Sequence, residues 1–452
     1  MTAGRGIRKW WHAVSLPVMV GSSARGVGEA EPVPAGERLL APDVLRGFAV
    51  LGILVVNIRS FSTPPYVGYL DSPFWAGSPD RACEWLIRTL AETKFYTLFA
   101  FLFGLGMAIQ SAHVKLRGGR FGWIYARRLF VLLGFGLVHA LFFWHGDVLT
   151  IYAALGLLLL VLRYLPNPVL LLLAATLHFG PLAIYVPQVL RTEELRRDPE
   201  YDVYITSWLA ERDADLLART QQAIAVYRQG RLGDMLRQRL RDHAFILADT
   251  LYYFVPQVLA LFLLGMVVGR WRILHAPDGH RRLWRGLTWV ALPLGLVAAA
   301  AAVGIEERVQ RIASWWNLTA YAIRLVATPL LSFGYAGALI LWLLRPGGQR
   351  RLAPLAAVGR MALTNYLLQT LVVTTLCYGY GLGWYGRLRP AWDVPLAAAV
   401  FGAQLGLSVW WLDRFRFGPL EWLWRSLTYW RWQPLRQPRP PRWPPPTQGL
   451  IT

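Results

Sequence analysis

Apolar stretches of about the length of a membrane span recur along the chain, with shorter polar connections between them. A helix needs about 20 predominantly apolar residues to cross a bilayer. The pattern therefore predicts an all-α polytopic membrane protein with about ten transmembrane helices. The spans are expected near residues 38–61, from about 95, 129–144, 148–162, 166–187, 245–268, 286–303, 321–344, 362–380 and 394–412.

Three segments differ from this pattern. Residues 1–37 are polar, glycine-rich and basic, which favours a disordered cytoplasmic leader over a cleaved signal peptide. Residues 191–242 are charged, with apolar residues at helical spacing, and are expected to form extracytoplasmic amphipathic helices on or beside the membrane. Residues 433–452 are proline-rich and are expected to be a disordered or extended tail. One transmembrane domain, 38–430, remains.

The composition agrees with a membrane protein. Of the 452 residues, 55% are apolar and only 16% are charged, whereas a soluble chain would carry about a quarter of charged residues. The net charge of +21 is explained by basic connections that face anionic lipid or an anionic cofactor, so the bilayer is the expected partner and nucleic acid is not. Cys83 and Cys377 support neither a disulfide framework nor a metal site.

Arginine accumulates on one side of the predicted topology. It is frequent in the connections after the second, sixth and eighth spans and in the segment after the tenth. Connections rich in lysine and arginine face the cytoplasm. We therefore predict that the protein lies in a bacterial plasma (inner) membrane with both termini cytoplasmic, as an even number of spans requires.

The first span carries polar residues at both ends of an otherwise apolar helix. Asp43 suits the first helical turn, and Arg46 follows it on the same face. Asn57 lies eleven residues after Arg46, which places the two on one stripe about 16 Å apart. Polar residues on one stripe of a membrane span indicate that the span handles something polar.

The third span repeats this spacing with Arg128 and His139. A titratable side chain within an apolar run is costly and is often functional; the alternative is a neutral histidine that bonds a backbone carbonyl or a hydroxyl. Asp147 lies just beyond the span and either orients the imidazole or caps the next helix. His145 lies in the turn itself and is expected to be solvated.

The last two spans supply a further polar set. Asn365 and Gln369 are four residues apart on the ninth span, and such an amide pair more often holds helices together than binds a substrate. Glu421 and Arg425 are four residues apart after the tenth span, a favourable helical pair. Arg360 precedes the ninth span and is expected to face the cytoplasm.

Five motifs, in one order, make a resemblance specific. They are PDVLRGFAVLGILVVNI, KFYTLFAFLFGLG, RRLFVLLGFGLVHALFFWHGDVLTIYAALG, GRMALTNYLLQT and RFGPLEWLWR. Through these motifs, which are spread from about residue 38 to 430, the chain resembles the YeiB family, long catalogued as a domain of unknown function. That family is similar to the wider transmembrane acyltransferases. The resemblance implies acyl transfer from a cytoplasmic CoA thioester to an extracytoplasmic acceptor, which is a small molecule, a lipid or a glycan.

The wider superfamily has an arginine, ten residues and a histidine in an early span that begins with an Asp-x-x-Arg-Gly sequence. Asp43, Arg46 and Gly47 match that beginning, but Asn57 stands where the histidine would be. The Arg-x(10)-His spacing occurs instead at Arg128 and His139 in the third span.

These residues make up a site hypothesis without a metal or a permanently bound cofactor. Acyl-CoA is the expected donor substrate, and it would lie in a groove between the first and third spans. The residues expected to hold its phosphates are Arg46, Arg128 and Arg360. His139 is expected to be a general base or a transient acyl carrier, helped by Asp147. Asn57 would donate a hydrogen bond to the developing oxyanion.

Two other functional classes fit the same buried polar residues. A transporter of a small polar or lipid-like molecule would use them as a pathway, and would favour inverted or repeated halves, of which the sequence shows no convincing sign. A structural or sensory membrane protein would use them only to hold helices together.

Overall fold

The computed structural model describes residues 39–71, 73–116 and 121–437. The predicted leader (1–37) and the part of the predicted tail after residue 437 lie outside the described residues. The described chain is all-α and forms no β-strand, only an isolated bridge between Phe415 and Arg436. The predicted fold class is confirmed.

The α-helices are α1 (Leu40–Ser62), α2 (Ser78–Leu90), α3 (Lys94–Leu116), α4 (Phe121–Phe142), α5 (Leu149–Leu162), α6 (Asn167–Leu195), α7 (Pro199–Gln229), α8 (Leu232–Asp249), α9 (Val255–Arg270), α10 (Arg281–Gly286), α11 (Leu292–Glu306), α12 (Trp315–Leu343), α13 (Gly348–Arg360), α14 (Ala362–Cys377), α15 (Asp393–Leu412) and α16 (Pro419–Tyr429). Short 3₁₀ or π turns connect or extend them: η3 (Pro65–Tyr69), η4 (Thr250–Phe254), η5 (Pro277–His280), η6 (Leu287–Ala291) and η7 (Pro390–Trp392).

Most of the predicted spans coincide with long apolar helices. Within the described chain, eight helical segments are long and apolar enough to cross a membrane. The fourth and ninth predicted spans coincide with α5 and α14, which are apolar but have only 14 and 16 residues, fewer than the roughly 17 at the lower end of the spanning range. The polytopic membrane character is confirmed, and the number of ten crossings stays a prediction.

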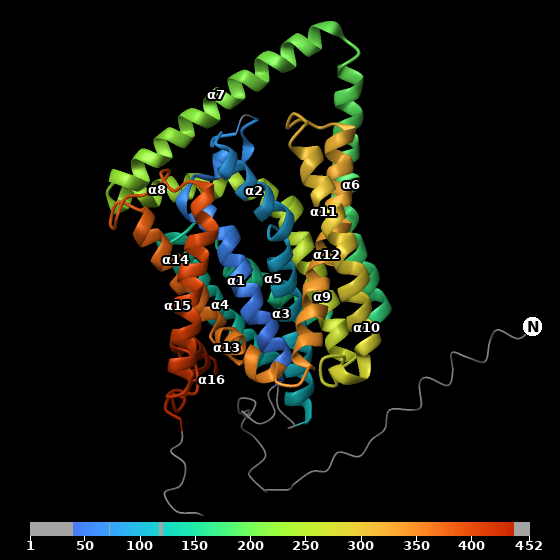
Figure 1. Ribbon diagram of the computed structural model, residues 1–452, viewed down its shortest axis with the longest axis vertical. Helices are drawn as coiled ribbons and strands as arrows, with labels where there is room; N and C mark the ends of the chain where they lie inside the picture. Colours follow the sequence, from blue (N-terminus) through green and yellow to red (C-terminus); the bar gives the residue numbers. More distant parts are fainter. Residues whose placement is uncertain (1–38, 72, 117–120, 438–452) are drawn as a thin grey trace, which may run out of the picture.

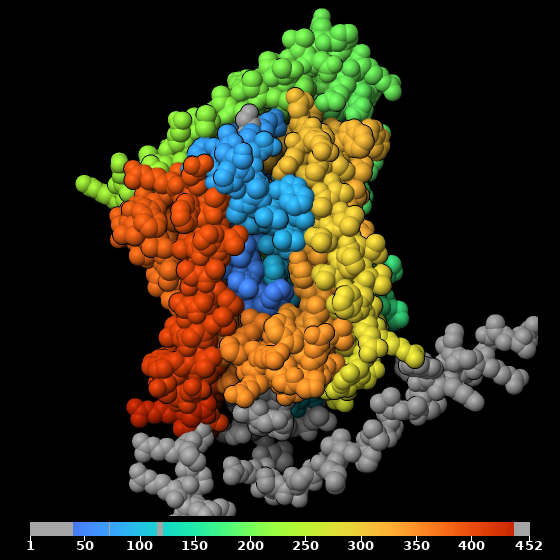
Figure 2. All heavy atoms as spheres, in the orientation of Figure 1, coloured from blue at the N-terminus to red at the C-terminus, as the bar shows by residue number. Residues whose placement is uncertain are grey.

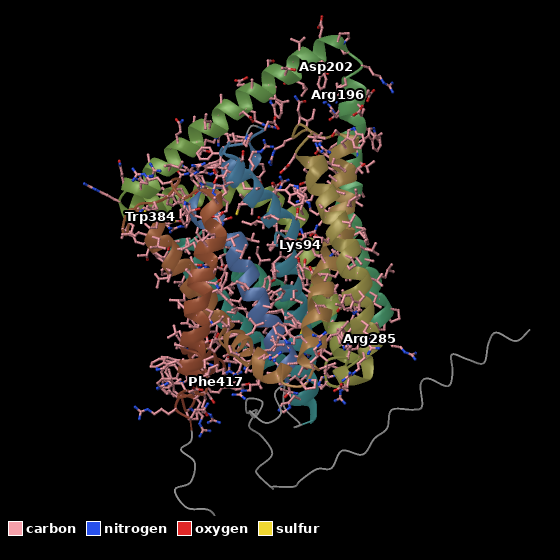
Figure 3. All side chains as sticks on the ribbon, in the orientation of Figure 1. Lys94, Arg196, Asp202, Arg285, Trp384 and Phe417 are labelled. Atoms are coloured by element: carbon pink, nitrogen blue, oxygen red, sulfur yellow. The ribbon has the colours of Figure 1, made fainter. Side chains whose placement is uncertain are left out.

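The helix bundle has two different ends. At one, which we call the α7 end, the long helix α7 runs obliquely across the ends of other helices (Figure 1). The opposite end, the α13 end, holds α13, α16 and the beginning of α1 (Figure 1). Arg196 and Asp202 lie at the α7 end, whereas Arg285 and Phe417 lie at the α13 end (Figure 3). The described chain therefore begins and ends at the α13 end (Figure 1).

The segment predicted to form amphipathic helices is helical. It comprises the end of α6, all of α7 and the beginning of α8. Of its periodic apolar residues, Leu209, Leu216 and Tyr227 are buried. The α7 side chains cover the α7 end of the molecule, while α2 lies between α15 and α11 on the face shown in Figure 2. The extracytoplasmic location of this segment stays a prediction.

Close backbone contacts fix α1 in the bundle. A Cβ added to Gly47 would clash with the Leu355 carbonyl oxygen of α13, and one added to Gly359 would clash with the Asp43 carbonyl oxygen. The two glycines therefore let the backbones of α1 and α13 touch, as small residues do between membrane helices. This packing holds Arg46 and Arg360 at the same end of the bundle.

The two ends make the predicted topology testable. Gly279 is exposed in η5 near the α13 end, and Asp198 is exposed at the N-terminus of α7. Because basic connections face the cytoplasm, reporter fusions at Gly279 and at the C-terminus are expected to give cytoplasmic signals. A fusion at Asp198 is expected to give an extracytoplasmic one. A cytoplasmic signal at Asp198 would overturn the predicted orientation.

Candidate functional site

A cavity of about 570 Å³ extends along the inside of the bundle from the α13 end. Its walls come mainly from α1, α3 and α4, with contributions from α14 and α16. It is lined by α1 and α4, the first and third spans, between which a groove is predicted. Most of the wall is aromatic and aliphatic, and Phe99, Phe103 and Leu132 lie along its middle.

Arginine side chains gather around this cavity at the α13 end. The three arginines predicted to hold phosphates all line it: Arg46, Arg128 and Arg360. The structure adds Arg272 and Arg425 to them. Five guanidinium groups around one opening, with the carboxylates of Asp43 and Glu421 as the acidic lining residues, favour an anionic ligand.

Two of these arginines are held in place by neighbouring side chains. Arg46 forms the predicted ion pair with Asp43, with a nitrogen–oxygen distance of 2.9 Å. Arg128 donates to Gln110 Oε1 at 3.0 Å, and its guanidinium lies 4.1 Å from the ring centre of Trp424. Such stacking and bonding orient a guanidinium before a ligand arrives. The Trp424 contact joins α4 to α16 and could not be found from sequence spacing.

A glycine keeps the cavity open beside Arg46. Gly104 and Gly106 of α3 are both candidates for close helix contact, but the structure separates them. A Cβ at Gly104 would clash with the Phe262 carbonyl oxygen of α9, whereas one at Gly106 would meet only Arg46 Nη2, at 3.4 Å. Gly104 is therefore a packing residue, and Gly106 lines the cavity.

The predicted oxyanion donor lies further along the same cavity. Asn57 lines the wall together with Val56 of α1 and Thr93, just before α3. The eleven residues from Arg46 to Asn57 correspond to about 16 Å of helix. The stripe of α1 predicted to carry both residues therefore forms part of the cavity wall. The Arg46 guanidinium lies at one level of the cavity and the Asn57 amide at another.

The structure places His139 beside the cavity rather than in its wall. His139 is only 2% exposed, and it is not among the residues that line the cavity. Tyr366 of α14 does line it, and the Tyr366 ring centre lies 5.3 Å from that of His139. The hydroxyl of Tyr366 is buried. Tyr366 therefore separates His139 from the cavity.

Both ring nitrogens of His139 have partners. Nδ1 lies 2.8 Å from Asp147 Oδ1, and Nε2 lies 3.0 Å from the hydroxyl oxygen of Thr370. Asp147 also contacts the next helix: its Oδ2 accepts hydrogen bonds of 2.8 Å from the backbone nitrogen and the hydroxyl of Thr150, near the start of α5. Thr370 was missed in the sequence because it lies 231 residues from His139.

The expectation that His145 is solvated is wrong. Its side chain is buried, with 4% of its surface exposed, because α8 packs over the turn. Arg239 of α8 donates to the Leu141 carbonyl, and the His243 ring centre lies 6.3 Å from that of His145. Burial lowers the pKa of His145 to about 3, and the charges of His243 and Arg239 act in the same direction.

This depressed pKa predicts acid sensitivity. Below pH 6.5 the unfolded chain protonates His145 while the folded chain does not, so stability falls as the pH falls from about 6.5 towards 3. The slope approaches about 1.4 kcal/mol per pH unit for this one group. Thermal unfolding in nanodiscs is expected to show a smaller loss between pH 7 and 4.5 for His145→Gln than for wild type. His280→Gln, which alters an exposed histidine, is the control; equal losses in all three proteins would contradict the prediction.

The remaining predicted polar residues hold helices together. Asn365 Nδ2 donates to Ser408 Oγ at 3.0 Å, and Gln369 Nε2 donates to Gln404 Oε1 at 2.9 Å. The amide pair therefore joins α14 to α15, as expected. Glu421 has a role that its spacing to Arg425 does not reveal.

Glu421 caps α14. Its carboxylate accepts hydrogen bonds from the backbone nitrogens of Leu363 and Thr364, at 2.7 and 3.1 Å, and from the Thr364 hydroxyl at 2.6 Å. Burial raises the pKa of Glu421, and these bonds oppose that change. The cap positions the first turns of α14, which carries Tyr366 and Thr370. Within the described residues, no group of histidine, cysteine and carboxylate side chains could hold a metal ion.

Comparison with known proteins places this chain in a family. Residues 268–431 match the family described as protein of unknown function DUF418. The uncharacterized protein YxaH of Bacillus subtilis is 36% identical over 421 residues, which cover 90% of this chain and 98% of the relative. The uncharacterized protein YeiB of Escherichia coli is 31% identical over 405 residues, 87% of this chain and 96% of the relative. No solved structure is significantly similar. The chain therefore belongs to the YeiB family of membrane proteins that carry the DUF418 domain.

Proposed function

We propose that the protein transfers an acyl group from a CoA thioester, bound from the cytoplasmic side, to a hydroxyl acceptor at the outer side. One observation carries this proposal: a single cavity joins a cluster of five arginines to Asn57 and runs past the shielded His139–Asp147 pair. A CoA thioester has an anionic head and a slender arm. Its site therefore needs positive charge at one end, a narrow passage for the arm and a base near the far end.

The length of the cavity suits this donor. With its phosphates at Arg46, Arg128 and Arg360, the arm of CoA would lie between apolar walls. About a dozen bonds of roughly 1.5 Å separate the diphosphate from the sulfur, and in an extended chain they advance about 16 Å. That matches the helical distance of about 16 Å from Arg46 to Asn57. The thioester carbonyl would then lie at the level of Asn57, whose amide can donate to the developing oxyanion.

The reaction needs one proton to be moved. The new ester C–O bond forms as the C–S bond of the thioester breaks, the acceptor hydroxyl loses its proton, and the CoA thiolate gains one. The His139 imidazole carries the proton between them, and Asp147 fixes its orientation and tautomer through Nδ1.

A pair of glycine variants tests the cavity. Gly106→Leu places a side chain in the cavity beside Arg46, whereas Gly134→Leu on α4 points into open space. In nanodiscs, Gly106→Leu is expected to weaken acetyl-CoA binding about tenfold or more, as expected when a packed site is overfilled. It should slow transfer of labelled acetyl groups to acceptors in a bacterial lipid and glycan extract. Gly134→Leu should match the wild type.

Two results would contradict the proposal. Equal binding by the two variants would place the donor elsewhere. Passage of intact acetyl-CoA or of lipid across a vesicle membrane, with no acylated product, would assign the cavity to transport.

A further inference from the structure

Thr370, His139 and Asp147 form a buried chain of hydrogen bonds that joins α14, α4 and the turn before α5. The Thr370 hydroxyl of α14 lies 3.0 Å from His139 Nε2 of α4, and His139 Nδ1 lies 2.8 Å from Asp147 Oδ1 just before α5. Thr370 is fully buried, and Asp147 is 5% exposed. Hydroxyl, imidazole and carboxylate follow one another in the order that activates a hydroxyl nucleophile.

The hydrogen-bond partners assign the protons. Asp147 Oδ2 accepts two bonds from Thr150, as an ionised carboxylate does. Its Oδ1 accepts from Nδ1–H of a neutral His139 imidazole, in which Nε2 carries no proton. The Thr370 hydroxyl donates to this nitrogen; its other contact, 3.4 Å to the Tyr366 carbonyl oxygen, is longer and weaker. The base is therefore already bonded to the hydroxyl of Thr370.

We infer that Thr370 accepts the acyl group before the final acceptor does, as an acyl-threonine ester. This rests on the proposed acyl transfer. In the first half, His139 Nε2 takes the hydroxyl proton, the Thr370 oxygen bonds to the thioester carbon, the C–S bond breaks, and the proton passes to the thiolate. In the second half, the acceptor hydroxyl gives its proton to His139, its oxygen takes the acyl carbon, and the proton returns to the Thr370 oxygen.

Tyr366 controls access to this hydroxyl. It precedes Thr370 by one turn of α14, lines the cavity and contacts the His139 ring. Rotation of the Tyr366 side chain is the movement that brings a thioester in the cavity to Thr370. While Tyr366 covers Thr370, His139 and Asp147, these residues are closed to water, which protects an ester on Thr370 from hydrolysis.

The experiment looks for the ester itself. Purified protein in nanodiscs is incubated with radiolabelled acetyl-CoA and no acceptor, and peptides are analysed by mass spectrometry. Acetyl label is expected on the α14 peptide that contains Thr370. Thr370→Val, which keeps the shape but removes the hydroxyl, is expected to lose the label and to reduce transfer at least 100-fold. Thr370→Ser should recover both.

Thr374→Val is the matched control. Thr374 is also fully buried on α14, one turn later, and its hydroxyl donates to the backbone carbonyls of Thr370 and Leu371 rather than to His139. It is expected to keep label and transfer. Transfer by Thr370→Val at the wild-type rate would overturn the threonine ester and leave the proposed function standing. Binding of acetyl-CoA with neither label nor transfer in the wild type would overturn both.

Discussion

Replacing His139 by glutamine is expected to leave donor binding intact and to reduce acyl transfer by about 10²- to 10⁴-fold, the contribution typical of a positioned general base. His139 does not line the cavity, so the change leaves the donor site unaltered. Glutamine still bonds to a carboxylate or a hydroxyl, but it does not exchange protons near neutral pH. Binding of acetyl-CoA and release of CoA thiol, measured on the same nanodisc sample, separate the two effects.

His178→Gln provides the control for losing a partly buried imidazole that bonds a backbone carbonyl. His178 lies on α6, and its Nε2 bonds the Leu325 carbonyl at 2.8 Å, away from the cavity lining. Its replacement is expected to change neither binding nor transfer by more than about twofold, because substitutions away from the site typically change free energies by less than about 0.5 kcal/mol. If His139→Gln transfers at the wild-type rate, His139 is a packing residue and the proposed chemistry fails.

Asp147→Asn is expected to have a smaller effect than His139→Gln. Asparagine retains an oxygen that can accept from Thr150 and so keeps the cap of α5. It loses the charge that favours the imidazolium formed during transfer. Transfer should therefore slow while the protein accumulates normally. A loss of transfer equal to that of His139→Gln would mean that Asp147 does more than orient the ring.

The sequence predicted what one helix determines by itself. Helical spacing correctly placed Arg46 beside Asp43 and placed Asn57 on the stripe that became the cavity wall. The apolar stretches located the spans, because in a bilayer only a continuous helix satisfies the backbone. Family resemblance agreed with these local features.

What the sequence missed depends on contacts between distant helices. Spacing put His139 on a polar stripe with Arg128, but it could not show that α14 would place Tyr366 and Thr370 against the imidazole. His145 was misjudged for the same reason, because nothing local indicates that α8 covers its turn. A periodic pattern gives the direction of a side chain and leaves its neighbour undetermined.

The second large effect concerns the arginines at the α13 end. Arg128→Gln and Arg360→Gln are each expected to weaken acetyl-CoA binding by about 10- to 100-fold, because a hydrogen bond to a charged group contributes about 1.5–3 kcal/mol. Raising the ionic strength should weaken binding to the wild type more than to the variants, since each variant has one screened interaction fewer. Equilibrium binding at two salt concentrations measures both effects.

Arg46 needs a different substitution. Asp43 is buried and forms an ion pair with Arg46, and removing one member of a buried ion pair is strongly destabilising. Arg46→Lys keeps the ion pair with Asp43 but loses the fork that binds a phosphate at two points. It is therefore expected to fold normally and to bind the donor more weakly, by a smaller factor than the two glutamine variants.

A surface arginine at the same end separates site chemistry from net charge. Arg285 is exposed and lies outside the cavity lining, so Arg285→Gln removes one positive charge without touching the site. It is expected to bind acetyl-CoA as the wild type does. Should Arg128→Gln and Arg360→Gln also bind normally but accumulate poorly, these arginines would be packing or topology residues, and the phosphate site would have to lie elsewhere. A loss confined to the cavity arginines leaves the five guanidinium groups as the place where an anionic donor is held.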